Sequence, residues 1–205
     1  MIGSLWHTQP LPLTVVQRAE WGALPPNLQA CEEQGHFDPR HNPGGWLEYP
    51  QPLSEVLRTI VVHHSALTPE IDVAAIQRLH QTERGFADIA YHFVVAADGQ
   101  VYEGRSLQVR GAHVQAANSG SVGVVLLGNF QQQWPTPAQL LALHSLVADL
   151  LRRAGGITHL AGHRQFNEET VCPGQHLMAL LPELAHAHGL RFGTGGYCSP
   201  NWVRK

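Results

Sequence analysis

The stretch Val122-Gly-Val-Val-Leu-Leu-Gly128 contains no polar side chain. A strand is apolar at successive positions when both faces of its sheet are covered, so this stretch predicts a central β-strand. The run Arg58-Thr-Ile-Val-Val-His63 is rich in β-branched residues and ends in a polar one, which predicts a second buried strand. Strands of this kind belong to a sheet with helices packed on it.

The segments between these two strands predict a helix and a hairpin. Asp72 can cap a helix whose apolar residues follow helical spacing, and Gly85 can close it. Two further strands are expected over 91–96 and 100–103, because the Asp-Gly pair between them is a strong hairpin signal.

The segments after residue 128 predict helices and one more strand. Thr136-Pro-Ala-Gln139 is a capping box with proline at the first helical position, so a long helix should begin there and end at the glycines 155–156. Residues 157–161 predict a short, edge-like strand. A last helix over 175–181 either continues past Pro182 with a kink or stops there. The sum is an α/β fold with a central mixed β-sheet flanked by helices.

The N-terminal part of the chain predicts an irregular arm wrapped on this core. Residues 1–57 are rich in Pro, Gly and Trp, and the stretch 31–51 is a long loop with several turn-forming pairs. Residues 189–205 form a C-terminal tail. We expect a single domain over 1–205, because this length with 43% hydrophobic residues supports one well-buried core.

Composition excludes several classes of partner. The formal net charge is −3 and the basic residues are scattered, so neither a nucleic-acid partner nor anionic lipid is expected. The N-terminus has no signal-peptide pattern, and no segment is apolar enough to insert into a membrane. The chain has three cysteines. If Cys172 binds a metal, Cys31 and Cys198 either form a disulfide or remain thiols.

His63, His163 and Cys172 form a candidate zinc site. A thiolate and two imidazoles suit zinc, and three protein ligands leave one coordination position open for catalysis. Taken alone, each histidine would more often be a packed or solvated residue. The Cys172-Pro-Gly run supports a metal-binding role for both. The adjacent His64 points to the opposite face of its strand. The set therefore predicts a hydrolase.

A series of ordered motifs resembles the peptidoglycan recognition proteins and their relatives, the zinc-dependent (type 2) N-acetylmuramoyl-L-alanine amidases. The resemblance covers roughly residues 14–185. The motifs that carry it are Arg18-Ala-Glu-Trp-Gly-Ala23, Val61-Val-His-His-Ser-Ala66, Asp88-Ile-Ala-Tyr-His-Phe93, Asp98-Gly-Gln-Val-Tyr-Glu-Gly-Arg105, Gly111-Ala-His113, Asn118, Ser121-Val-Gly-Val, Gly162-His-Arg164 and Thr170-Val-Cys-Pro-Gly174.

This resemblance implies one zinc ion held by His63, His163 and Cys172. It implies a catalytic role for Tyr91, which would orient a water or donate to an oxyanion, with Thr170 assisting. A related branch of amidases uses a glutamate in the strand that begins at residue 122, and this chain has none there. The stretch from His163 to Cys172 is one residue longer than the family pattern.

The resemblance also implies a substrate groove. Candidate substrate-binding residues are His64, His92, Arg105, His113 and Asn118. Among these, His64 is expected to face the sheet or support the site, and His113 either supports the fold or touches substrate. An arginine at position 105 can hold the extra carboxylate of diaminopimelic acid, although Phe86 replaces the tryptophan that accompanies it in such relatives.

The implied activity is hydrolysis of the amide between N-acetylmuramic acid and L-alanine in peptidoglycan, by a monomer. The alternatives are a non-catalytic peptidoglycan-binding module, and a structural zinc protein with His64 or His113 as a fourth ligand. The missing cysteine pair after the His-His motif points away from an animal secreted protein. We expect a cytoplasmic protein, or one delivered to the cell wall by phage lysis or a secretion system.

Overall fold

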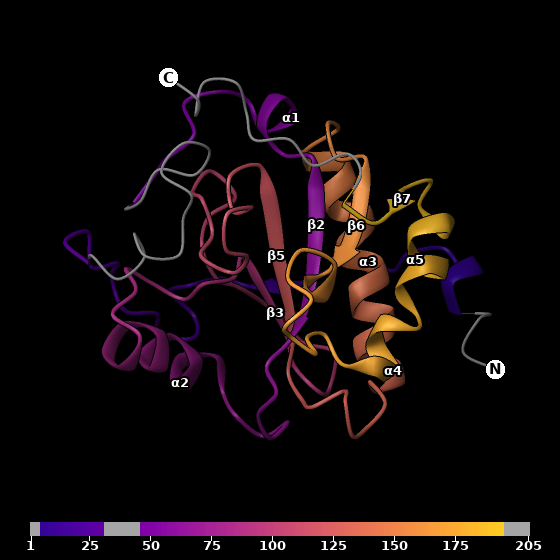
Figure 1. The fold of residues 1–205 in the computed structure, drawn as a ribbon, viewed down its shortest axis with the longest axis horizontal. Helices are drawn as coiled ribbons and strands as arrows, with labels where there is room; N and C mark the ends of the chain where they lie inside the picture. The colour runs from indigo at the N-terminus through magenta and orange to yellow at the C-terminus, as the bar shows by residue number, and fades with distance from the viewer. Residues whose placement is uncertain (1–4, 31–45, 195–205) are drawn as a thin grey trace.

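The computed structural model describes residues 5–30 and 46–194 of the 205-residue chain. Its centre is a seven-stranded sheet with the order β1-β4-β3-β5-β2-β6-β7 (Figure 1). The strands are β1 (Val15–Val16), β2 (Thr59–His64), β3 (Phe93–Val95), β4 (Val101–Glu103), β5 (Ser121–Leu126), β6 (His159–Gly162) and β7 (Arg191–Phe192). Strands β3 and β4 pair antiparallel and all other neighbours pair parallel, so the predicted mixed sheet is confirmed.

The two apolar runs form the middle of the sheet. Strands β5 and β2 pair over six positions, from Thr59↔Ser121 to His64↔Leu126, and every residue of both strands is buried. The predicted hairpin is confirmed by the antiparallel pairing of β3 with β4. The prediction of an edge-like strand over 157–161 is wrong, because β7 pairs with the outer side of β6. A two-residue strand carries too little periodicity to be recognised from sequence.

In the described part of the chain, five α-helices accompany the sheet. They are α1 (Leu53–Val56), α2 (Val73–Arg78), α3 (Pro137–Arg153), α4 (Gln175–Met178) and α5 (Leu181–Ala187). Single turns lie at η1 (Leu5–His7) and η4 (His163–Gln165), and a π-helical turn, η3 (Leu79–Glu83), extends α2.

The helix caps follow the sequence signals. Thr136 Oγ1 accepts a hydrogen bond from Gln139 N at 3.0 Å, and Gln139 Oε1 accepts one from Thr136 N at 3.1 Å, which completes the capping box of α3. Asp72 Oδ1 accepts from Ala75 N at the start of α2. The last helix differs from both expectations, because α4 ends at Met178 and a new helix begins at Leu181 with Pro182 in its first turn. Proline is tolerated there, since the first-turn N–H groups have no partner in the helix.

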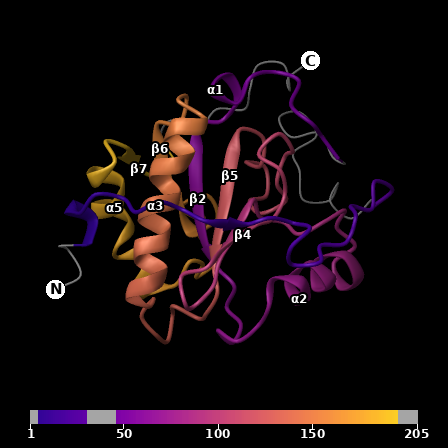
Figure 2. The ribbon, with the colours of Figure 1, turned by 180° about the vertical axis from the view of Figure 1, so that it is seen from behind.

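Successive side chains of β2 point to opposite faces of the sheet. Ile60 and Val62 belong to the main core together with the buried side of α3, whereas Val61 packs on the other face against Val114 and Ala117. Figure 2 shows that α3 and the N-terminal arm lie over the first of these faces. His63 follows the period of Val61, so its side chain lies on the face away from α3.

Within its described residues, the N-terminal arm is irregular apart from η1, β1 and the short helix α1. Trp6 is buried in the main core, and the hydroxyl of Tyr49 accepts a hydrogen bond from Gly120 N at 3.1 Å. Most of the expected 31–51 loop, with Cys31, lies outside the described residues, as does Cys198. Within the described part of the chain, no helix is long and apolar enough to cross a membrane.

Candidate metal centre

Two neighbouring parallel strands bring His63 and His163 together. Strand β2 pairs with β6 in a register that ends at Val62↔Gly162, and each histidine is the next residue along its own chain. Their ring centroids are 4.7 Å apart. The carboxyl ends of parallel strands meet at one edge of the sheet, so this pair follows directly from the strand register.

Cys172 reaches the two histidines through a loop that folds back on itself. Arg164 N donates to the carbonyl of Cys172 at 2.8 Å, and Cys172 N donates to Thr170 Oγ1 at 3.2 Å. The backbone N–H of His64 points at Cys172 Sγ at 3.4 Å. These three contacts fix the sulfur beside the end of β2.

The three side chains fit a zinc ion. Their ligand atoms all lie within 4.8 Å of one another, and His63 Nδ1 is 3.6 Å from Cys172 Sγ. With Zn–N near 2.05 Å and Zn–S near 2.3 Å, tetrahedral geometry separates nitrogen from sulfur by about 3.6 Å. Among the described residues no fourth ligand joins this group. The donor set is therefore that of a site with an open position.

Burial keeps the ligands neutral in the metal-free protein. Burial, and then the nearby His163, His113 and His64, lower the pKa of His63 well below its ordinary value. Burial, with His64, lowers the pKa of His163 to about 4. Burial raises the pKa of the Cys172 thiol to about 12, against the effect of the His64 N–H. The imidazoles are thus ready to bind, and the thiol must lose its proton to do so.

Tyr91 lies beside the metal ligands. Its ring centroid is 5.1 Å from that of His63, and the side chain is partly exposed. Burial of the hydroxyl, and then the neighbouring Cys172, raise the pKa of Tyr91 above its ordinary value. The phenol therefore stays protonated and can donate a hydrogen bond to a group at the metal position.

The sequence profile of the N-acetylmuramoyl-L-alanine amidase family matches residues 53–175. The chain belongs to this family. It is 33% identical to peptidoglycan-recognition protein SD of Drosophila simulans over 177 residues, which cover 82% of this chain and 84% of that protein. It is 38% identical to an N-acetylmuramoyl-L-alanine amidase of Sus scrofa over 144 residues, 64% of this chain and 24% of the longer relative.

The fold of this amidase-family chain matches solved peptidoglycan recognition proteins. The structure of peptidoglycan recognition protein-LE in complex with tracheal cytotoxin, a monomeric diaminopimelic acid-type peptidoglycan, superposes with a TM-score of 0.66 at 27% identity. The match covers 82% of this chain and 92% of that one. The fold predicted from the resemblance is therefore confirmed.

The predicted groove residues His92 and Asn118 are buried supports instead. Both side chains are fully buried. His92 Nε2 lies 2.9 Å from the carbonyl of Val109, and its Nδ1 accepts from Gly123 N at 2.9 Å. Asn118 Oδ1 accepts from the backbone N–H groups of His113 and the next residue at 2.7 and 2.8 Å. The prediction of direct substrate contact is corrected for these two, because both are buried and His92 and Asn118 Oδ1 bond to backbone, while Asn118 Nδ2 has no hydrogen-bond partner among the described residues.

Arg105 is buried as well, at 2% exposure. Its guanidinium donates to the carbonyls of Ile89 at 2.6 Å, Arg110 at 3.0 Å and Asp88 at 3.3 Å. These bonds tie together the loops that lead to Tyr91, so the predicted carboxylate contact is corrected to a structural role.

His64 and His113 lie on opposite sides of the site. The His64 ring packs on Phe130, whose backbone N–H donates to His64 Nδ1 at 3.2 Å, so the side chain faces the core rather than His63, as expected. His113 is 7% exposed, and its Nδ1 is 3.0 Å from His63 Nε2. Neither ring is a fourth ligand, which removes the argument for a closed structural zinc site.

Three residues that the sequence did not single out lie around Tyr91. A cavity of about 80 Å³ beside it is lined in part by Ser65, His80 and Arg84. The His80 ring is buried, and its centroid is 5.7 Å from that of Tyr91. Helical spacing from Ile76 places His80 on the inner face of its helix, so periodicity is the signal that could have found it.

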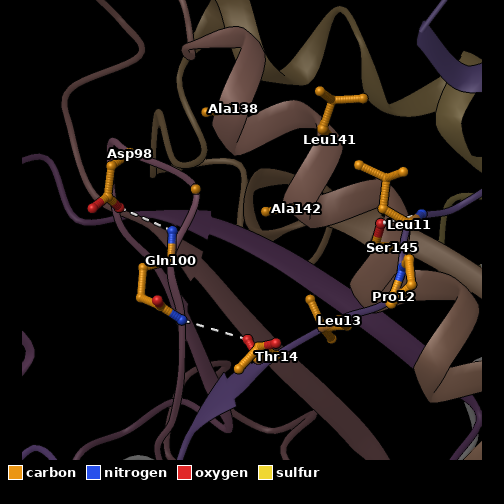
Figure 3. Close-up of a pocket in the computed structure, with 11 residues that line it drawn as sticks. Leu11, Pro12, Leu13, Thr14, Asp98, Gln100, Ala138, Leu141, Ala142 and Ser145 are labelled. Atoms are coloured by element: carbon orange, nitrogen blue, oxygen red, sulfur yellow. Dashed lines mark hydrogen bonds between the residues drawn. The ribbon is translucent and has the colours of Figure 1, made fainter.

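A larger hollow lies between the N-terminal arm and α3 (Figure 3). Its volume is about 380 Å³, and residues such as Leu13, Leu141 and Ala142 line it. Asp98 is its one acidic residue, and that carboxylate accepts a hydrogen bond from Gln100 N at 2.9 Å. Because α3 covers the face of the sheet opposite His63, this hollow is separate from the metal centre.

Proposed function

We propose that this protein is a zinc-dependent amidase that hydrolyses the amide between N-acetylmuramic acid and L-alanine in peptidoglycan. The observation that carries the proposal is the three-residue donor set of His63, His163 and Cys172, whose ligand atoms lie within 4.8 Å of one another, with the Tyr91 ring 5.1 Å from that of His63 between centroids. Peptidoglycan as the substrate is supported by relatives named for recognising it, and by the bound cytotoxin of one structural neighbour.

The side chains of the site have two roles, which are binding of the metal and control of a proton. One zinc ion, when bound, supplies a Lewis acid that lowers the pKa of a coordinated water toward 7 and polarises the amide carbonyl. His63 and Cys172 are buried, whereas His163 and Tyr91 are partly exposed. Substrate therefore approaches from the side of His163 and Tyr91.

Tyr91 donates a hydrogen bond to the oxygen that gains charge as the amide is attacked. Its raised pKa keeps the proton available near neutral pH. Thr170 acts through the ligand loop, because its Oγ1 accepts from the backbone N–H of Cys172 and so helps to place the sulfur.

A non-catalytic peptidoglycan-binding module is the second candidate. Such a module needs the groove but not a complete metal-ligand set. Cys172 and Tyr91 are both in place against His63, at 3.6 Å from its Nδ1 and 5.1 Å between ring centroids respectively. That arrangement favours the enzyme.

The test compares Cys172→Ala with Val171→Ala, an adjacent residue whose side chain is 52% exposed. Purified wild-type protein and Val171→Ala should contain about one zinc per chain and release free stem peptides that begin with L-alanine from peptidoglycan. Cys172→Ala should keep the fold and lose both properties. Full activity of Cys172→Ala, or products cleaved between sugars, would refute the amidase, and bound but uncut sacculi would support the binding module.

A further inference from the structure

The two ring nitrogens of His63 have different partners. Nδ1 faces Cys172 Sγ at 3.6 Å, whereas Nε2 faces His113 Nδ1 at 3.0 Å. A neutral imidazole carries one N–H, and only its bare nitrogen can bind a metal. The metal-binding geometry therefore requires the proton of His63 to sit on Nε2.

His113 can enforce that tautomer, because its own proton has a fixed place. His113 makes a hydrogen bond with the backbone of Ser121, and its Nε2 is 3.4 Å from Ser121 Oγ. The Ser121 hydroxyl hydrogen is committed to the carbonyls of Ala117 at 2.8 Å and Asn118 at 3.0 Å. Among the described residues, the groups that contact His113 Nε2 are thus acceptors. This nitrogen must carry the proton of the neutral ring, which leaves Nδ1 bare to accept a hydrogen bond from His63.

A slot between two glycines fixes the orientation of the His113 ring. A Cβ atom on Gly111 or on Gly123 would lie 2.5 Å from His113 Cδ2, closer than real Cβ contacts allow. The His92 ring packs edge-on against His113 with centroids 5.7 Å apart. The backbone N–H of His113 is held by Asn118 Oδ1 at 2.7 Å. The ring is therefore enclosed by neighbours that are themselves hydrogen-bonded to backbone.

We propose that His113 is a positioning residue that holds His63 in the Nε2–H tautomer, with Nδ1 directed at the metal position, and that Ser121 is the fixed end of this hydrogen-bond chain. The inference deepens the proposed function and rests on its zinc ligands. Groups that hydrogen-bond to the free ring nitrogen of a metal-bound histidine fix its orientation in this manner, and their loss typically costs 10–100-fold in metal affinity.

The test uses two variants of nearly equal shape. In His113→Asn the amide oxygen can take the place of Nδ1 and accept from His63, whereas His113→Leu has the same size and no acceptor. Zinc affinity, measured by competition with a chromogenic chelator, should stay near the wild-type value for the Asn variant. It should fall roughly 10–100-fold for the Leu variant. His144→Leu is the control, because it breaks another histidine pair, with His188 Nε2 at 2.8 Å from His144 Nδ1, away from the site. It should lower the melting temperature without changing zinc affinity.

A second measurement reads the tautomer directly and needs no variant. Nitrogen NMR of ¹⁵N-histidine-labelled, zinc-free protein should show His63 protonated on Nε2 alone. Protonation on Nδ1, a mixture of tautomers, or wild-type zinc affinity in His113→Leu would overturn the proposal. A protein that shows the predicted tautomer and zinc affinity but cuts no peptidoglycan would instead refute the proposed function.

Discussion

Gly123→Ala should weaken zinc binding through His113 without touching any metal ligand. Gly123 lies in the middle of β5, and its backbone conformation is one that alanine adopts without strain. An added Cβ would lie 2.5 Å from His113 Cδ2 and 2.6 Å from Cγ. The ring is therefore the atom group that the methyl displaces.

The size of the effect follows from these distances. Ordinary contacts of a Cβ atom begin near 3.4 Å, so the ring must retreat by about 1 Å. If that movement lengthens the 3.0 Å contact between His113 Nδ1 and His63 Nε2 to roughly 4 Å, the hydrogen bond is lost. We expect a 10–100-fold lower zinc affinity and about 1–3 kcal/mol of destabilisation from overpacking.

The assay pairs Gly123→Ala with Gly155→Ala, since a Cβ at Gly155 meets no atom within 4 Å. Chelator competition gives the zinc affinity of each, and urea denaturation of the zinc-free proteins gives their stability. Gly155→Ala should match wild type in affinity. If Gly123→Ala binds zinc as tightly as wild type while being destabilised, the tight fit of the His113 ring against Gly123 contributes only to core packing, and it does not position His63.

Two further predictions concern Tyr91 and the buried histidines. Tyr91→Phe should retain its zinc but lose a donor to the oxyanion, so turnover on a soluble muramyl peptide should fall roughly 100–1,000-fold; unchanged turnover would remove Tyr91 from the mechanism. Burial lowers the pKa of His92 from 6.5 to about 4. Below pH 6.5 the unfolded chain therefore binds a proton at this histidine that the native chain does not bind, and the free energy of unfolding falls as the pH drops. The free energy of unfolding of the zinc-free protein should decrease by about 3 kcal/mol per such histidine between these pH values. His92→Gln should show a shallower decrease, and an equal slope would contradict the assignment.

The middle of the fold could be predicted from sequence because its signals are local. An apolar run marks β5, and reciprocal side-chain caps at Thr136 and Gln139 mark the start of α3. The features that were missed are the ones that local patterns do not encode. Strand β7 has two residues and exists only because β6 offers an edge to pair with, and the break before Pro182 depends on tertiary packing.

The grouping of the candidate metal ligands was predictable for a different reason. Imidazole and thiolate groups suit zinc wherever they stand in the chain. Two adjacent parallel strands bring His63 and His163 together. The contact between His63 and His113 spans 50 positions. It depends on the direction of a ring between two glycine backbones, which no spacing rule provides.

Motif similarity marks residues that a site requires, but it does not separate those that touch substrate from those that hold the site in place. Burial makes that separation here. His92, Arg105 and Asn118 are at most 2% exposed and hydrogen-bonded to backbone, so their polar groups rigidify the loops around the metal centre. Substrate contacts must then come from side chains that reach solvent near the open position. Tyr91 and Arg84, which line the same small cavity, meet that requirement, and the peptide side of the substrate should be sought there.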